Sequence, residues 1–303
     1  MADERLPSWR PGATRDAIIG YLDGIADVPV EHRVAYLDND GTMWCERPRY
    51  IQLDFFVDAL RQQSSTDPSL SERPELAAVL SGDAAAMGEI GSAKIAVALA
   101  GLFDGRTPDE FGAAVDTFVQ RYRHPKFGSP VSSLVYQPML ELLDELRAHG
   151  FTVGIVSAGG TEFVRRVSPT LYGVPPELVV GTLIGYEFVR DGRDRPQLRR
   201  TVTLMGDANE GEAKVGHIQS QLGRAPMVAV GNSGGDREML EWANAGRHPG
   251  LSILIDHDDA DREYAYASTA ATFAETEPIT SVASRLGWTT VSMAGDWATV
   301  FPG

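Results

Sequence analysis

Four short apolar runs along the chain have the length and composition of buried strands. They cover residues 34–37, 151–156, 227–230 and 251–255. An amphipathic helical pattern at 139–146 precedes the second run, and another helical stretch at 236–245 separates the last two. Strands that alternate with helices in this way predict an α/β fold with a parallel sheet and right-handed crossovers.

The segment between the first two strands has a different pattern. Residues 43–135 carry apolar residues at helical spacing, such as Phe111 and Val115, with loop breaks and no convincing strand. We expect a small helical unit whose aromatic residues pack its own core. Residues 181–205 contain two strand-like runs around an Asp-Gly turn, which predicts a β-hairpin. The residues after Glu263 are expected to form helix and loop.

Composition and charge narrow the classes of partner. The chain has 303 residues, 43% of them hydrophobic, and a net charge of -15, so it lacks the general positive field that attracts nucleic acid or anionic membranes. No run approaches the roughly 20 apolar residues of a membrane span, and no signal-peptide pattern is present, so we expect a cytoplasmic protein. The single Cys45 excludes an internal disulfide. A small-molecule ligand is expected, and the oligomeric state stays open.

Two carboxylates directly follow the first predicted strand. Asp38 and Asp40 are two residues apart on an extended segment, so their side chains point to the same side; Gly41 and Thr42 come next. Neighbouring carboxylates repel each other unless a cation or a shared proton lies between them, so this arrangement is costly for structure alone. The alternative is an ordinary turn of solvated Asp, Asn and Gly residues.

Other polar residues follow the later strands. Ser157 begins a Ser-Ala-Gly-Gly-Thr segment before a helical stretch, where a hydroxyl and free backbone amides suit an anion. The run at 227–230 leads to Asn232 and Asp236, and Lys214 lies upstream of it. Taken singly, each has a plain structural explanation, such as a surface lysine or a helix N-cap aspartate.

Because these residues lie at or near the ends of predicted strands, we consider them together as parts of one site. The carboxyl ends of adjacent strands in an open α/β sheet share one ligand crevice, so we expect the residues to meet there. Oxygen ligands suit Mg²⁺, which binds few carboxylates together with water and substrate phosphate. The predicted metal ligands are Asp38, Asp40 and Asp236, with Asn232 as a further oxygen donor. The predicted phosphate-binding residues are Thr42, Ser157, Ala158, Gly159 and Lys214.

In order and placement, these residues resemble the motifs of the haloacid dehalogenase superfamily, and more narrowly its phosphoserine phosphatase-like branch. The four motifs are matched by Asp38-Asn-Asp-Gly-Thr42, Ser157, Lys214 and Gly231-Asn-Ser-Gly-Gly-Asp236. The resemblance implies a Rossmann-like three-layer sandwich with a central parallel sheet, formed by residues 1–42 and 136–303. It also implies that residues 43–135 form an inserted helical cap domain.

The same resemblance implies a Mg²⁺-dependent phosphomonoester hydrolase that acts on a small phosphorylated metabolite through an aspartyl-phosphate. Asp38 would be the nucleophile, and Asp40 would protonate the leaving oxygen and then activate water. Ser157 and Lys214 would hold the transferring phosphoryl group. True dehalogenases of the superfamily lack the second aspartate, so Asp40 favours phosphate-ester chemistry. A phosphomutase or phosphotransferase of the same fold and a non-catalytic phosphate-binding protein remain the alternatives.

Two residues depart from the family pattern. Asn39 stands where an apolar residue is more usual, and we expect its side chain to point away from both carboxylates. Asn232 replaces the first aspartate of the fourth motif, which removes a negative charge near the metal. Close behind the first motif, Glu46, Arg47 and Arg49 are expected to form surface ion pairs, because Glu and Arg side chains are mostly exposed. The alternative is that they face the leaving group from the entrance of the cap.

Overall fold

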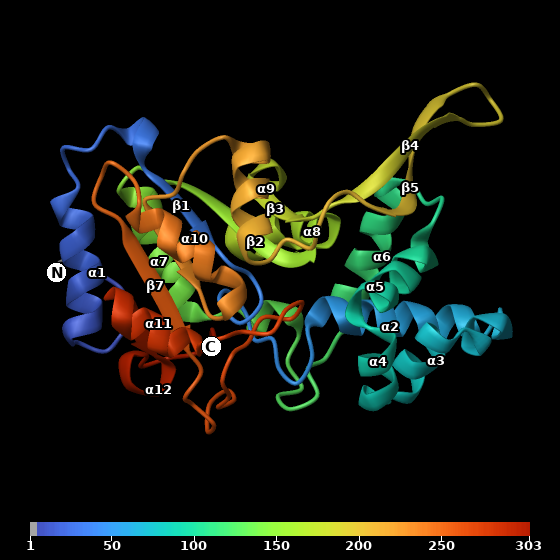
Figure 1. Cartoon of the computed structure of the whole chain (residues 1–303), viewed down its shortest axis with the longest axis horizontal. Coiled ribbons are helices and arrows are strands. Elements are labelled where there is room, and N and C mark those ends of the chain that lie inside the picture. Colours follow the sequence, from blue (N-terminus) through green and yellow to red (C-terminus); the bar gives the residue numbers. More distant parts are fainter. Residues whose placement is uncertain (1–4) are drawn as a thin grey trace.

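A six-stranded, wholly parallel sheet forms the centre of the molecule in the computed structural model, which describes residues 5–303 (Figure 1). The strand order is β3-β2-β1-β6-β7-β8. The strands are β1 (Val34–Leu37), β2 (Thr152–Gly160), β3 (Val179–Thr182), β6 (Val228–Gly231), β7 (Leu251–Asp256) and β8 (Thr289–Ser292). The α/β fold class predicted from the sequence is confirmed.

Different helices cover the two faces of the sheet, because successive side chains of a strand point to opposite faces. Ala35 and Leu37 of β1 belong to one apolar cluster, whereas Val34 and Tyr36 belong to the other. The first cluster is packed by α1 (Ala13–Gly24), α7 (Gln137–Ala148), α8 (Thr161–Tyr172) and α12 (Met293–Asp296). The second is packed by α9 (Glu212–Leu222), α10 (Arg237–Asn244) and α11 (Ile279–Leu286). All four β1 side chains are therefore buried.

The chain between β1 and α7 contributes a set of helices at one side of the sheet (Figure 1). They are α2 (Ile51–Ser64), α3 (Pro74–Ser81), α4 (Ala84–Ile90), α5 (Ser92–Ala100) and α6 (Pro108–Arg121). Phe55 of α2 lies at their centre, with ring centroids 5.1 Å from Phe103 and 5.6 Å from Phe111. The same ring lies 5.5 Å from Phe163 of α8. The inserted helices and the sheet domain thus share one apolar cluster.

A two-stranded antiparallel hairpin, β4 (Ile184–Arg190) and β5 (Pro196–Leu204), extends from the body beside α5 and α6 (Figure 1). Arg200 of β5 anchors it. The Arg200 side chain is only 4% exposed, its Nε donates to Glu162 Oε2 of α8 at 2.6 Å, and its guanidinium lies 4.2 Å from the Phe111 ring centroid. One arginine therefore ties the hairpin to both the inserted helices and the sheet domain.

Replacing Arg200 by Met is expected to lower the free energy of unfolding by about 2 kcal/mol. Removing one partner of a buried ion pair leaves the other charge uncompensated, but Glu162 is 15% exposed and can regain some solvent. Urea denaturation of the variant measures this loss. Arg199→Met is the matched control, because Arg199 is an exposed neighbour on the same strand. An equal loss in the control would show that the ion pair contributes little.

Two strands of the sheet differ from the sequence-based expectation. β8 lies within the tail for which we expected only helix and loop; three of its four residues are Thr or Ser, so no apolar run marks it. β3 begins at Val179, before the segment that we assigned to the hairpin. Within residues 5–303, no single helix is long and apolar enough to span a membrane, although α4 together with the α5 segment to Phe103 would pass such a test as a pair bent by 94°.

Candidate functional site

The carboxyl ends of β2, β1 and β6 bring the predicted chemical residues together. Asp38 follows β1 directly, and its backbone N–H donates to the Val230 carbonyl of β6 at 2.9 Å. Ser157 lies in β2, which pairs with the other side of β1. Lys214 reaches the same place from the first turn of α9. Strand pairing alone thus positions residues that are far apart in sequence.

Lys214 forms a buried charge cluster with two aspartates. Its Nζ donates to Asp38 Oδ1 at 2.8 Å and to Asp236 Oδ1 at 2.5 Å, and the side chain is 1% exposed. Burial alone would lower the pKa of Lys214, but the two carboxylates outweigh it and raise that pKa, so the ammonium stays charged. Burial and the nearby Asp236 carboxylate raise the pKa of Asp38 well above its ordinary value, against the opposing effect of Lys214.

Asp236 is fully engaged in this arrangement. Besides the Lys214 contact at Oδ1, its Oδ2 accepts hydrogen bonds from the backbone N–H of Asn232 at 3.0 Å and of Ser233 at 3.1 Å. Asp236 thus holds both Lys214 and the loop after β6, and its expected role as a metal ligand stays a prediction. Within residues 5–303, no group of three His, Cys, Asp or Glu side chains is placed to hold a metal ion.

Asp40 lies beside this cluster with its own hydrogen bonds. Trp44 Nε1 donates to Asp40 Oδ1 at 2.9 Å, while Asn39 Nδ2 and Ser157 Oγ each donate to Oδ2 at 3.3 Å. Burial raises the pKa of Asp40, and these three hydrogen bonds oppose that rise because they favour the ionised carboxylate. Asp38 and Asp40 are thus held by different partners, one by a cation and the other by neutral donors.

The Asn39 side chain is a correction to the sequence-based expectation. It is fully buried and does not point away from both carboxylates, because its Nδ2 donates to Asp40. Its Oδ1 accepts a hydrogen bond from Tyr172 OH at 3.0 Å. Asn39 therefore links Asp40 to the end of α8. Neither this link nor the Trp44 contact could be found by spacing alone, because each depends on how the loop after β1 folds back.

The Ser157 segment runs from the end of β2 directly into α8. Ser157 Oγ accepts a hydrogen bond from Gly159 N at 3.0 Å and faces Asp40. One residue of the inserted helices reaches this loop, since Gln52 Oε1 of α2 accepts from Gly160 N at 2.9 Å. Sequence analysis missed Gln52, which brings the inserted helices into contact with the predicted phosphate-binding loop.

Thr42 and Asn232 meet on the other side of the first motif. Thr42 is fully buried, and its Oγ1 donates to Asn232 Oδ1 at the long distance of 3.5 Å. The Thr42 hydroxyl therefore faces the fourth motif, where the family pattern has an aspartate. The Asn232 oxygen is the atom at this position that could serve as a metal ligand, as a neutral donor in place of a carboxylate.

The acidic and basic residues after the first motif do not all form the surface ion pairs that we expected. Arg49 does bind Asp54 of α2, at 2.5 Å. Glu46, by contrast, is 7% exposed, and Arg47 places its guanidinium 4.2 Å from the Tyr266 ring centroid. The position of Glu46 was not predictable from its neighbours in sequence, because its burial depends on segments more than 180 residues away.

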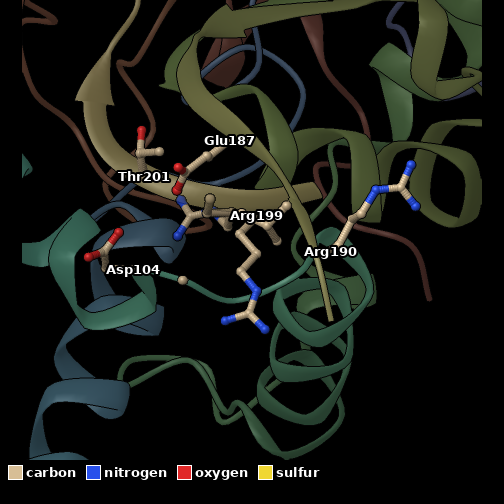
Figure 2. Close-up of a pocket in the computed structure, with 8 residues that line it drawn as sticks. Asp104, Glu187, Arg190, Arg199 and Thr201 are labelled. Carbon is tan, nitrogen blue, oxygen red and sulfur yellow. The ribbon is translucent and has the colours of Figure 1, made fainter. Parts of the chain in front are cut away.

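A separate open groove of about 360 Å³ lies between the hairpin and the loop before α6 (Figure 2). Figure 2 shows the acidic residues Asp104 and Glu187 and the basic residues Arg190 and Arg199 around this groove. None of the residues that line this groove belongs to the strand-end cluster. We therefore place the candidate active site at the strand ends and not in the groove.

A family model described as haloacid dehalogenase-like hydrolase matches residues 35–241, a segment that includes all four predicted motifs. No curated protein gives a significant match.

Among solved structures, a protein with unknown function from Bordetella pertussis Tohama I is 18% identical, with a TM-score of 0.55 over 86% of this chain and 98% of that one. A functionally unknown protein from Anaerococcus prevotii DSM 20548 is 13% identical, with a TM-score of 0.55 over 91% of each chain. A phosphoserine phosphatase structure in apo form is 15% identical, covers 74% of this chain and 86% of that one, and has a TM-score of 0.38. The first two likenesses support the fold.

Proposed function

The chain belongs to the haloacid dehalogenase-like hydrolase family, and from this premise we propose that it hydrolyses small phosphomonoesters through a covalent aspartyl-phosphate. The observation that carries the proposal is the pair formed by Asp38 and Lys214, at 2.8 Å, beside the independently held Asp40. A nucleophile next to a fixed cation and a nearby proton carrier is what two-step phosphoryl transfer requires.

The proposed reaction has two steps. In the first, a carboxylate oxygen of Asp38 forms a bond to phosphorus, the phosphorus–oxygen bond of the ester breaks, and Asp40 gives its proton to the leaving alcohol. In the second, Asp40 takes a proton from water as the water oxygen attacks phosphorus, which releases phosphate and regenerates Asp38. Lys214 and Ser157 hold the phosphoryl oxygens. The raised pKa of Asp40 suits its role as the acid of the first step.

The residues present fit a Mg²⁺ ion by their donor chemistry. The Asp38 carboxylate, the Asp40 backbone carbonyl and the Asn232 side-chain oxygen are all hard oxygen donors near one strand end, and they would hold the ion. When bound, Mg²⁺ would neutralise charge on an anionic substrate. Asp236 is left to position Lys214, since its oxygens already accept the hydrogen bonds described above.

A small substrate fits both the enclosure and the charge of the protein. Asp38, Ser157 and Lys214 are all less than 9% exposed, so a bulky phosphopolymer would not reach them. The net charge of -15 also disfavours nucleic acid, whereas the local Lys214 cation attracts a single phosphate group.

The direct test is phosphate release from a broad panel of small phosphomonoesters, with Mg²⁺ and with EDTA. Release that requires the metal would support the proposal, and trapping of phosphate on Asp38 would support the covalent step. Formation of an isomeric sugar phosphate without free phosphate would instead identify a mutase. No turnover across the panel in the presence of Mg²⁺ would contradict the proposal.

Replacing Trp44 by Phe is expected to move the alkaline limb of the pH profile of kcat/KM to higher pH. The change removes the Trp44 hydrogen bond to ionised Asp40 and so raises the pKa of Asp40 further, which keeps the proton needed in the first step to a higher pH. A hydrogen bond of about 0.5–1.5 kcal/mol corresponds to a shift of up to about one pH unit. A shift to lower pH would contradict the assignment of Asp40 as the acid. Trp288→Phe, which changes a tryptophan of the other apolar cluster, is the control.

A further inference from the structure

Glu46 is a buried carboxylate that the proposed mechanism does not use. A side chain added at Gly41 would place its Cβ 2.9 Å from Glu46 Cδ and 2.0 Å from Asn232 Nδ2. The Glu46 carboxyl group and the Asn232 amide therefore both lie against the backbone of Gly41, which directly follows Asp40. Only glycine fits there, both for this reason and because its φ is +76°.

The direct contact between these two side chains is weak. Asn232 Nδ2 is 3.5 Å from Glu46 Oε1, at the outer limit of a hydrogen bond. The same amide nitrogen also lies 3.3 Å from Ser268 Oγ, a second acceptor for its hydrogens. One amide group shared in this way offers Glu46 little compensation for burial, because a buried carboxylate needs a strong partner.

The neighbouring groups that can carry positive charge bond elsewhere. His257 Nε2 donates to the Gly41 carbonyl at 2.8 Å, since that oxygen can only accept, and His257 Nδ1 lies 3.4 Å from Glu263. Arg47 stacks on the Tyr266 ring. Among the described residues, no ion pair involves Glu46. Burial raises the pKa of Glu46, while His257, the Tyr266 hydroxyl and Arg47 oppose that rise.

The charges around the first motif suggest a role for this buried carboxylate. The family pattern has an aspartate at position 232, where this chain has a neutral asparagine whose amide nitrogen points at Glu46. Asp236 is less free to replace that charge than Asp38, because its Oδ1 accepts from Lys214 and its Oδ2 accepts from two backbone N–H groups. Position 232 thus lacks a carboxylate, and the Glu46 carboxylate, which forms no ion pair among the described residues, lies 3.5 Å from the Asn232 amide nitrogen.

We propose that Glu46 supplies to the Mg²⁺ site the negative charge that Asn232 lacks, so that the third acidic residue of the site comes from the segment after the first motif. The inference rests on the proposed function, in which Mg²⁺ binds next to Asp38 and Asp40. It assigns Glu46 and Asn232 as a pair: the glutamate carries the charge, and the asparagine contributes its amide.

The test moves the negative charge from position 46 to position 232 and measures the affinity for the metal ion in the absence of substrate. The full chain, stripped with EDTA, is titrated with Mg²⁺ by calorimetry, and with Mn²⁺ by electron paramagnetic resonance. Glu46→Gln is expected to weaken binding about 10- to 100-fold. Adding Asn232→Asp to Glu46→Gln returns the charge to position 232 and should restore most of the affinity. Asp54→Asn, which neutralises a buried carboxylate of α2, should bind like the wild type.

The outcomes separate this inference from the proposed function. Wild-type affinity in Glu46→Gln, or no recovery in the double variant, would overturn the role of Glu46 while leaving the phosphatase proposal intact. Absence of Mg²⁺ and Mn²⁺ binding in the wild type would overturn both the metal dependence and the inference. If Glu46→Gln does not fold, Glu46→Asp retains the charge but withdraws it by one methylene. Its affinity should then fall, and wild-type affinity there would equally overturn the role of Glu46.

Discussion

Asp38→Asn is expected to reduce phosphate release by at least about 10⁴-fold while the protein stays folded. The asparagine amide cannot attack phosphorus, so no aspartyl-phosphate forms. Folding should not suffer, because Lys214 keeps Asp236 as its partner and one of two neighbouring buried carboxylates becomes neutral. Phosphate release under saturating Mg²⁺ measures the loss of activity, and a thermal unfolding curve shows whether the variant stays folded.

Asp54→Asn is the matched control for this variant, since it makes the same chemical change at a buried aspartate of α2 that binds Arg49 and Tyr122. Its activity should remain close to that of the wild type. If Asp38→Asn kept more than a small fraction of the activity, Asp38 would not be the nucleophile. If it lost activity only because it unfolded, the thermal curve would show this directly.

Lys214→Met should lower the free energy of unfolding by about 3–5 kcal/mol at pH 7, the cost of removing one partner from a buried charge cluster. Asp38 and Asp236 would then face each other without a cation in an almost dry environment. Urea denaturation of the variant and the wild type gives the difference. Adding Asp236→Asn should recover part of the loss, because it removes one of the two unpaired charges.

The loss in Lys214→Met should also depend on pH. Burial and mutual repulsion raise the folded-state pKa of Asp38 already in the wild type, and removing Lys214 raises it further. A carboxyl group with a raised folded pKa binds a proton more readily in the folded state than in the unfolded state, so the variant regains stability as the pH falls. Repeating the denaturation at pH 5 tests this; an equal loss at pH 5 and pH 7 would contradict the predicted pairing.

Sequence reasoning located the strand ends because each sheet strand near the site is a short apolar run followed at once by a polar residue. The positions of Asp38 and Ser157 follow from that pattern together with the rules for parallel sheets. Lys214, which lies in α9, was assigned to the site through the family resemblance. β8 was not predicted because it lies at the edge of the sheet and has only one fully buried residue, Val291, so it shows no apolar run. Local pattern therefore predicts the central strands better than the edge.

The contacts that decide the fine chemistry of the site could not be predicted in this way. Asn39 is joined to Tyr172, 133 residues away, and Glu46 to Asn232, 186 residues away. Nothing in the sequence near Glu46 distinguishes a solvated glutamate from one that is enclosed by a distant loop. Its burial depends on the packing of the chain around Gly41, which only the three-dimensional arrangement reveals.

The aromatic cluster around Phe55 also limits how the molecule can admit a substrate. Swinging the inserted helices away from the sheet domain as a rigid lid would separate Phe55 from Phe163 and expose both rings, at a cost of several kcal/mol. Breaking the ion pair between Arg200 and Glu162 would add to this free-energy cost. We therefore expect entry through local rearrangement around Gln52 at the start of α2, with little change in overall dimensions. Small-angle X-ray scattering with and without vanadate tests this, and a marked contraction would reveal a hinged lid after all.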